Sequence, residues 1–104
     1  MVSAVLQRDL NLDRISLDGF AVRRRSATLH FGGGDRPETR DSPWWVYLGC
    51  EPIPARYDVS PRPMWLRAST ISGRRIEALA RIVARRDDGY GTELILTGQG
   101  SLVA

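Results

Sequence analysis

The chain has 104 residues, of which 42% are hydrophobic and 26% are charged, and its formal net charge at pH 7 is +3. This length fits one domain spanning 1–104 with a modest core, and the composition argues against disorder along the whole chain. One cysteine and one histidine exclude an intrachain disulfide and a zinc site built from several thiolates and imidazoles.

Membrane targeting is not expected. No apolar stretch approaches 18 residues, so the sequence predicts no membrane partner. The first residues meet an acid, Asp9, too soon to form the hydrophobic part of a signal peptide. We therefore expect synthesis in the cytoplasm.

The first twelve residues carry an apolar stripe made of Val2, Val5, Leu6 and Leu10. A short helix and an extended arm that docks on a neighbour would both give this spacing. Residues 1–12 are therefore a possible arm, with both structures left open.

An Asp18-Gly19 pair separates two short alternating runs, Ile15–Leu17 and Phe20–Val22. This pattern predicts a β-hairpin, because glycine tolerates the positive φ that a two-residue turn needs. A third alternating run, Ser26–Phe31, predicts another strand.

A polar segment, residues 32–43, comes next. It holds three glycines, two prolines, five charges and no apolar residue, so we predict a long exposed loop. Loops of this length in a small domain are usually functional or ordered by a partner. We assign it as a candidate assembly loop with these residues: Gly32, Gly33, Gly34, Arg36 and Arg40.

Aromatic and β-branched residues at Trp44–Leu48 predict a strand whose alternate residues, from Trp44 onward, face the core. Four prolines then bracket residues 55–59, which predicts an edge strand or an irregular crossing. Met64–Leu66 predicts a further short strand.

Residues 74–86 fit two structures. Ile76, Leu79, Ala80 and Val83 share one helical face, whereas Ile76, Ala78, Ala80, Ile82 and Ala84 form an apolar face at period two. A turn at residues 87–91 and a strand at 92–97 follow, and we favour a hairpin over a helix–turn–strand.

The fold class that follows is mainly β: a small single-domain barrel or sandwich, with or without one short helix. The apolar phase of the strands predicts this core: Phe20, Val22, Leu29, Phe31, Val46, Leu48, Ile82, Leu94 and Leu96.

No recognisable catalytic apparatus accompanies this fold. His30 lies in mid-strand, with no motif to activate a serine or Cys50, and Cys50 itself is expected to be a small buried hydrophobe. Asp87-Asp88 before a glycine is typical of a turn, and the glycines at 32–34 lack both a Walker lysine and a dinucleotide spacing. We predict a protein that is not an enzyme and that holds no metal and no cofactor.

A proline-flanked strand (Met64–Arg67), a Ser72-Gly73 turn, an apolar strand, Asp87-Asp88-Gly89 and a closing Glu93–Gly98 follow one another between Pro61 and Gly100. This succession resembles the small β-barrel proteins that join phage heads to tails. In that family the barrels form rings at the neck, and long loops and terminal arms reach neighbouring subunits. The resemblance implies a structural neck or tail component of a phage or prophage virion, with a homo-oligomeric ring and other virion subunits as its partners.

Two alternatives remain. The sequences Arg36-Pro-Glu-Thr-Arg40 and Asp58-Val-Ser60 resemble the cyclic di-GMP motifs of PilZ domains, although a proline, Pro63, stands where that family has a glycine.

The other alternative is a small basic barrel that binds nucleic acid. All fifteen basic residues are arginine, and guanidinium groups bind phosphates bidentately. Arg23, Arg24 and Arg25 lie beside the predicted hairpin and are candidates for phosphate contacts, with Trp44, Trp45 and Tyr47 as candidates for stacking on bases.

Overall fold

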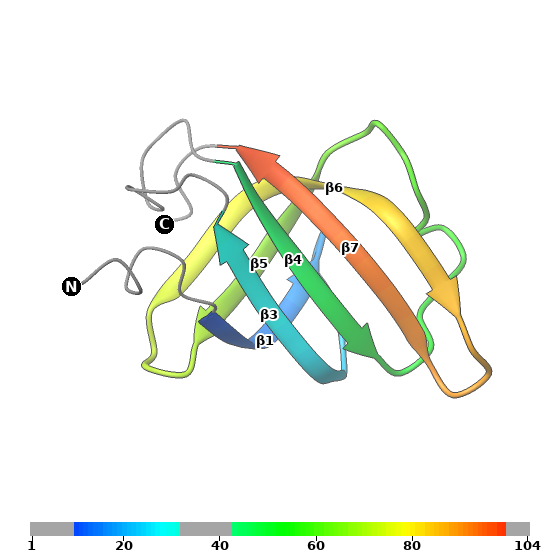
Figure 1. Cartoon of the computed structure of the whole chain (residues 1–104), viewed down its shortest axis with the longest axis horizontal. Helices are drawn as coiled ribbons and strands as arrows, with labels where there is room; N and C mark the ends of the chain where they lie inside the picture. The colour runs from blue at the N-terminus through cyan, green and yellow to red at the C-terminus, as the bar shows by residue number, and fades with distance from the viewer. Residues whose placement is uncertain (1–9, 32–42, 100–104) are drawn as a thin grey trace.

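Seven strands and no helix make up the part of the chain that the computed structural model describes, residues 10–31 and 43–99 (Figure 1). No segment within these ranges is a helix that could cross a membrane. The strands are β1 (Leu10–Leu17), β2 (Phe20–Ala21), β3 (Arg24–Phe31), β4 (Pro43–Cys50), β5 (Met64–Thr70), β6 (Arg75–Asp87) and β7 (Thr92–Gln99).

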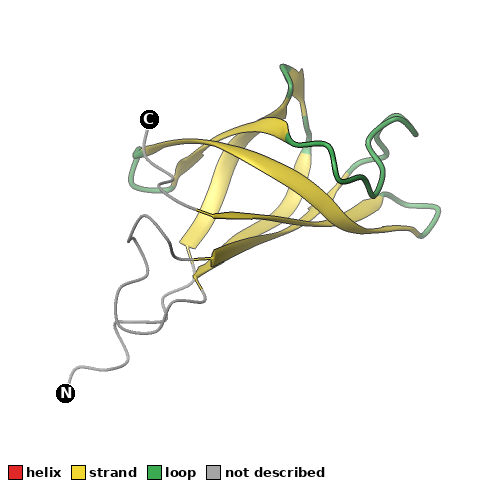
Figure 2. Cartoon of the chain, turned by 90° about the horizontal axis from the view of Figure 1, so that it is seen from above, coloured by secondary structure: helices red, strands yellow, loops and turns green. Residues whose placement is uncertain are grey.

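The sheet closes on itself. Its strands follow the order β2-β1-β3-β4-β7-β6-β5, all pairs are antiparallel, and an additional pairing joins β1 to β5. Six strands therefore form a closed antiparallel barrel, and β2 is an extra short strand on β1. Figure 2 shows the strands crossing one another on opposite walls of this barrel. The prediction of a small, mainly β domain is confirmed, and its barrel form is the one adopted.

The hairpin predicted at Asp18-Gly19 is confirmed. Leu17 pairs with Phe20, which leaves two residues in the turn. Asp18 and Gly19 have φ values of 47° and 84°, the left-handed conformation that a two-residue hairpin turn requires at both positions. The local sequence thus determines this part of the backbone directly.

The segment at residues 74–86, whose sequence fits both a helix and a strand, forms strand β6 from Arg75 onward, and the favoured hairpin prediction is correct. β6 pairs with β5 along its first half and with β7 along its second half. Its period-two apolar residues point into the barrel, where Ile76, Ala78, Ala80 and Ile82 are buried. β6 therefore has a paired neighbour along its whole length, first β5 and then β7, and this tertiary context outweighs the local helical spacing.

The core fills the barrel. Of the nine predicted core residues, seven are buried, Phe20 is partly buried and packs against the core, and the side chain of Phe31 lies outside the described part. Trp44, at 0% exposure, and Cys50 are also inside, as expected. The buried residues that the prediction missed include Leu12, Ile15, Leu17, Ile53, Tyr57 and Leu66.

The proline-rich segment between β4 and β5 crosses the end of the barrel without forming a strand. Ile53 and Tyr57 bury their side chains in the core, and Phe20 packs against Tyr57 with ring centroids 5.3 Å apart. The segment rejoins the wall where the Ser60 backbone amide donates to the Ile82 carbonyl at 3.2 Å. The irregular crossing predicted here is confirmed.

Candidate functional site: the outer wall of the barrel

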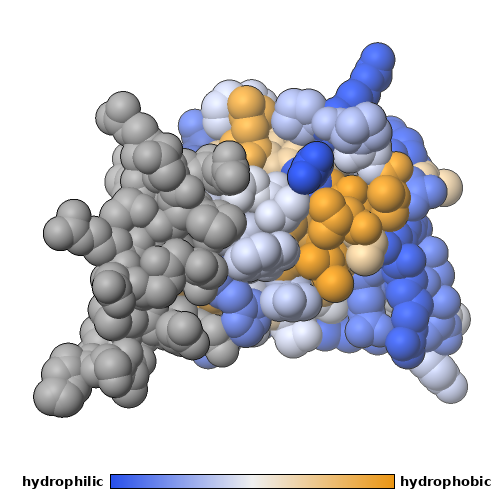
Figure 3. Space-filling view, turned by 45° about the horizontal axis from the view of Figure 1, so that its top comes forward, coloured by the Kyte–Doolittle hydropathy of each residue, from blue (hydrophilic) through white to orange (hydrophobic). Residues whose placement is uncertain are grey.

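The outer wall carries large apolar side chains that the core does not use. Trp65 on β5 is 45% exposed, and Leu79, its partner across the β5–β6 pairing, is 49% exposed. Val83 on β6 is also exposed. β6 crosses the top of Figure 1, and Figure 3, which brings that side forward, shows apolar side chains gathered among polar and charged ones. This wall is a candidate protein-contact surface.

Alternation along β5 places Trp65 outside, because Leu66 and Ala68 take the inward positions. The hairpin turn of β1–β2 fixes the backbone at this point. Asp18 donates its backbone amide to the Trp65 carbonyl at 2.8 Å, and its side chain accepts a hydrogen bond from the Trp65 amide at 2.8 Å. Trp65 therefore projects from a rigid part of the wall. The ion pair between Arg67 and Glu77, at 2.8 Å, lies beside it.

A second feature is a hollow of about 420 Å3 over β3, β4, β7 and β6. Gly49 helps to form it, because a Cβ at that position would lie only 3.0 Å from Ser26 Oγ. The other main lining side chains are Thr28, Tyr47, Ala84, Arg86, Glu93 and Ile95. An Arg86–Glu93 ion pair at 3.5 Å borders the hollow. The hollow thus combines an apolar side and a charged rim.

Trp65 and Gly49 lie on opposite walls, and the hollow extends from Gly49 over β7 to the second half of β6. Around the six-stranded barrel, β5 and β4 are three places apart in either direction. One wall therefore presents a projecting aromatic side chain, and the opposite wall presents a recess with an apolar side.

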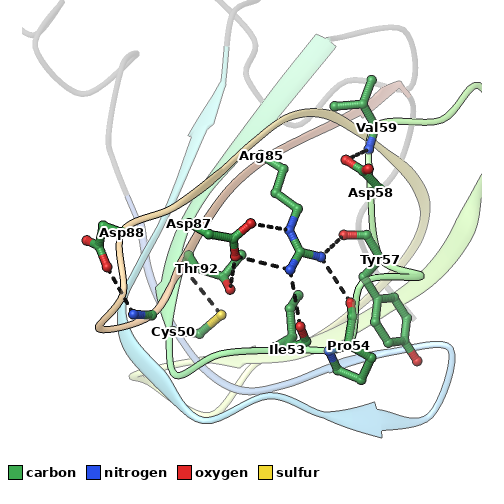
Figure 4. Close-up of polar contacts among 11 residues, drawn as sticks. Cys50, Ile53, Pro54, Tyr57, Asp58, Val59, Arg85, Asp87, Asp88 and Thr92 are labelled. Atoms are coloured by element: carbon green, nitrogen blue, oxygen red, sulfur yellow. Dashed lines mark hydrogen bonds and ion pairs between the residues drawn. The ribbon is translucent and has the colours of Figure 1, made fainter.

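The third feature is a buried arginine at the end of the barrel (Figure 4). The Arg85 side chain is 11% exposed, and each of its five N–H groups has an acceptor. Nε and Nη2 bind the two oxygens of Asp87 at 3.1 Å each. The remaining three donors bind the backbone carbonyls of Ile53, Pro54 and Tyr57. Arg85 therefore fastens the proline-rich segment to β6, which is a structural role.

The carboxylate of Asp87 is held in the ionised form. The hydrogen bonds from Arg85 and from the Thr92 hydroxyl lower the pKa of Asp87 below its ordinary value. Cys50 lies nearby and donates to the Thr92 carbonyl at 3.5 Å, and burial raises the pKa of its thiol. A protonated buried thiol is a poor nucleophile, so Cys50 acts here as a core residue.

The three arginines predicted to contact phosphate do not gather into one site. Arg24 forms an ion pair with Asp13 at 3.1 Å, and Arg25 donates to the Tyr90 carbonyl. Arg23 is exposed. The proposed stacking set is also divided, because Trp44 lies in the core whereas Tyr47 is exposed.

The sequence also predicted an assembly loop and a possible N-terminal arm. The assembly loop with Gly32, Gly33, Gly34, Arg36 and Arg40 lies outside the described residues, as does most of the possible arm at 1–12.

Of the second PilZ-like motif, Asp58 accepts the amide of the next residue and Ser60 accepts the amide of Arg62, so both side chains form local turns. The acid pair before Gly89 also has structural roles. Asp88 accepts the backbone amides of Tyr90 and Gly91, as a turn former does, and Asp87 binds Arg85.

The polar side chains bring no catalytic constellation together in the described part of the barrel. His30 packs edge-on against Tyr47, with ring centroids 4.7 Å apart. Within residues 10–31 and 43–99, no group of three metal-ligating side chains lies together. Comparison of the chain with models of known families, with curated proteins and with solved structures finds no match.

Proposed function

We propose that this protein is a non-enzymatic assembly protein whose barrels associate head to tail into a homo-oligomeric ring. The observation that carries the proposal is the placement of Trp65 and Gly49, which helps to form the hollow, on opposite walls. A contact between two different patches of the same molecule repeats from subunit to subunit, and it forms a ring when the rotation closes. Trp65 of one subunit occupies the hollow of the next.

The chemistry of both surfaces supports this contact. Tryptophan is among the residues that contribute most to binding at interfaces, where it fills a pocket surrounded by a polar rim. Each surface has one arginine–glutamate pair beside its apolar centre, Arg67–Glu77 on one wall and Arg86–Glu93 on the other. The rims are therefore complementary in charge when the pairs meet in opposite order. Because barrel closure gives each of the six wall strands a neighbour on both sides, the proposed association uses side-chain faces and not strand edges.

A structural ring component is also what the resemblance to phage head–tail joining barrels implies. We propose a place in the neck or tail of a phage or prophage virion, with other virion subunits above and below the ring. Neighbouring genes test this assignment: portal, terminase and tail genes beside the coding sequence are expected, and their absence from related loci would contradict it.

Sedimentation velocity at increasing protein concentration tests the ring. We expect the native chain to form one defined oligomer. Trp65→Ser, which removes the projecting side chain, and Ser26→Tyr, which fills the hollow from an exposed position, should each leave monomers. Tyr90→Ser is the matched control, because Tyr90 is an exposed aromatic residue in the β6–β7 turn that does not line the hollow and does not lie on β5 with Trp65.

Mixing the two variants identifies the head-to-tail geometry. Trp65→Ser keeps an intact hollow, and Ser26→Tyr keeps an intact Trp65, so the mixture should form a one-to-one dimer that cannot grow. A native chain that stays monomeric at all concentrations would overturn the ring. A native oligomer together with no dimer in the mixture would overturn the proposed contact.

A further inference from the structure

A groove of about 640 Å3 opens on the outer wall between β1, β5 and β6. Its charged and polar lining comes from Arg14 on β1, Arg67 and Ser69 on β5, and Arg75 and Glu77 on β6. Three arginines against one glutamate make the groove positive. Glu77 forms an ion pair with Arg67. Among the described residues, Arg14 and Arg75 have no side-chain hydrogen bond or ion pair.

The backbone makes Arg14 available to this groove. The pairing of β1 with β5 shifts register between Asp13 and Ser16, so β1 contains a bulge. Arg14 sits in this bulge with φ of 52°, a conformation that costs a residue with a side chain about 1–2 kcal/mol. The bulge turns both Asp13 and Arg14 outward, between the buried Leu12 and Ile15.

Asp13, the nearest carboxylate in sequence to Arg14, already accepts two hydrogen bonds that do not come from the Arg14 guanidinium. It accepts the backbone amide of Arg14 at 2.8 Å and the Nε of Arg24 at 3.1 Å, and these two bonds lower its pKa. Asp13 therefore makes its ion pair with Arg24, and it interacts with the guanidinium of Arg14 through charge alone, without a side-chain hydrogen bond. Conformational strain that presents an unpaired cation at a groove is typical of a binding site.

We propose that this groove binds the phosphodiester backbone of nucleic acid through Arg14 and Arg75, while Arg67 stays paired with Glu77. The groove is open and not enclosed, and its cations come from three strands, which suits a polymer with repeated charges better than a single small anion. Arg14 on β1 and Arg75 on β6 lie on the two sides of β5, the strand that pairs with both β1 and β6. They can therefore contact different phosphates.

The residues that line the groove also determine how it recognises nucleic acid. No aromatic ring and no amide side chain lines the groove, so it has no aromatic platform on which bases stack and no Asn or Gln to read the edge of adenine. Guanidinium–phosphate contacts position the chain without selecting a sequence, and their strength falls as salt rises because counterions are released on binding. Binding should therefore be independent of sequence and sensitive to salt.

Fluorescence anisotropy with a labelled random-sequence DNA duplex, measured over a range of salt concentrations, tests the groove. The test variant is Arg14→Gln with Arg75→Gln, and the matched control is Arg56→Gln with Arg62→Gln. Both remove two exposed arginines and the same net charge, but the control leaves the groove intact. We expect the test variant to lose about tenfold or more in affinity at low salt. Its slope of log affinity against log salt should fall by about 1.8, which corresponds to two phosphates.

Four outcomes overturn the groove: no binding of the native chain at low salt, no loss in the test variant, an equal loss in the control, or a sequence preference that survives physiological salt. Inorganic phosphate and heparin serve as competitors. Displacement by millimolar phosphate would indicate a small-anion site and contradict a polymer site. Sedimentation of the test variant separates this proposal from the ring, since neither substituted side chain belongs to the Trp65 surface or the Gly49 hollow.

Discussion

Arg85 and Arg14 are the same residue type in two opposite situations on one barrel. All five N–H groups of Arg85 are bound, its side chain is only 11% exposed, and its partners come from two parts of the chain, the proline-rich segment and β6. Arg14 is exposed on a strained bulge, and its neighbouring carboxylate is bound to Arg24. In a protein with fifteen arginines, charge alone does not separate structural from functional positions. The number of guanidinium N–H groups that have an acceptor separates the structural Arg85 from Arg14, the residue that we propose binds phosphate.

The largest effect is expected for Arg85→Met. This change leaves three carbonyls of the proline-rich segment without their donor, whereas the Asp87 carboxylate, 56% exposed, is solvated by water, so we expect a loss of about 2–3 kcal/mol of unfolding free energy. Urea denaturation measures the loss. Arg14→Met is the control and should change the free energy of unfolding by no more than about 0.5 kcal/mol. Equal losses of stability for the two substitutions would contradict the conclusion that Arg85 is structural and Arg14 is not.

Arg85→Lys sharpens the same comparison. Lysine keeps the positive charge but has three donors in place of five, and it lacks the planar fork that binds both oxygens of Asp87. We expect a loss of roughly 1–2 kcal/mol, between the native chain and Arg85→Met. The same urea titration gives this value. Full retention of stability would show that the charge matters and the donor geometry does not.

A smaller effect is expected when the free energy of unfolding is measured at acid pH. The pKa of Asp87 is lowered in the folded state, chiefly by Arg85, so its contribution to stability is complete above the unfolded value of about 3.9. The contribution is lost as pH falls through the lower folded value. Urea denaturation between neutral pH and about pH 2 should show this loss in the native chain. Asp87→Asn should be less stable at neutral pH and should show a shallower fall in acid.

The smallest effect is expected for Arg14→Gly. Glycine relieves the positive φ of the bulge but adds freedom to the unfolded chain, so the free energy of unfolding should stay the same or rise by up to about 1 kcal/mol. Thermal melting measures the change. If the groove binds phosphate, this variant should lose affinity for DNA without losing stability. A marked fall in melting temperature would mean that Arg14 is structural after all.

The parts of this molecule that local sequence determines were predictable. Asp18-Gly19 specifies its turn within two residues, and the alternation of β4 and β7 predicts which side chains are buried. The strand at 75–87 required a choice, because its residues also fit a helix. Only the pairing of β6 with two other strands decides that choice, and no window of the sequence contains it.

The surface features depend on contacts that are distant in sequence, and for this reason they were missed. Trp44 and Trp65 both start alternating strands, yet one is buried and the other is exposed. The partners of Arg85 include carbonyls about thirty residues away, at Ile53 and Tyr57. Arg85 did leave one signal: it follows directly on the apolar face of β6, close to Asp87. The Arg14 bulge left no such signal, because it exists only in the register between β1 and β5.

The pairing of β1 with β5 has a consequence for how the chain folds. It joins Leu12 to Thr70 and, like the pairing of β4 with β7, it connects strands that are not consecutive in the chain. Contacts between distant residues form slowly, because a long stretch of chain loses its freedom before they contribute stability. During synthesis, β1 emerges first, and one of its edges stays unpaired until residue 70 has left the ribosome. Closure is therefore expected to limit the folding rate, and the open edge of β1 is the point at which a nascent chain is most exposed to wrong pairing.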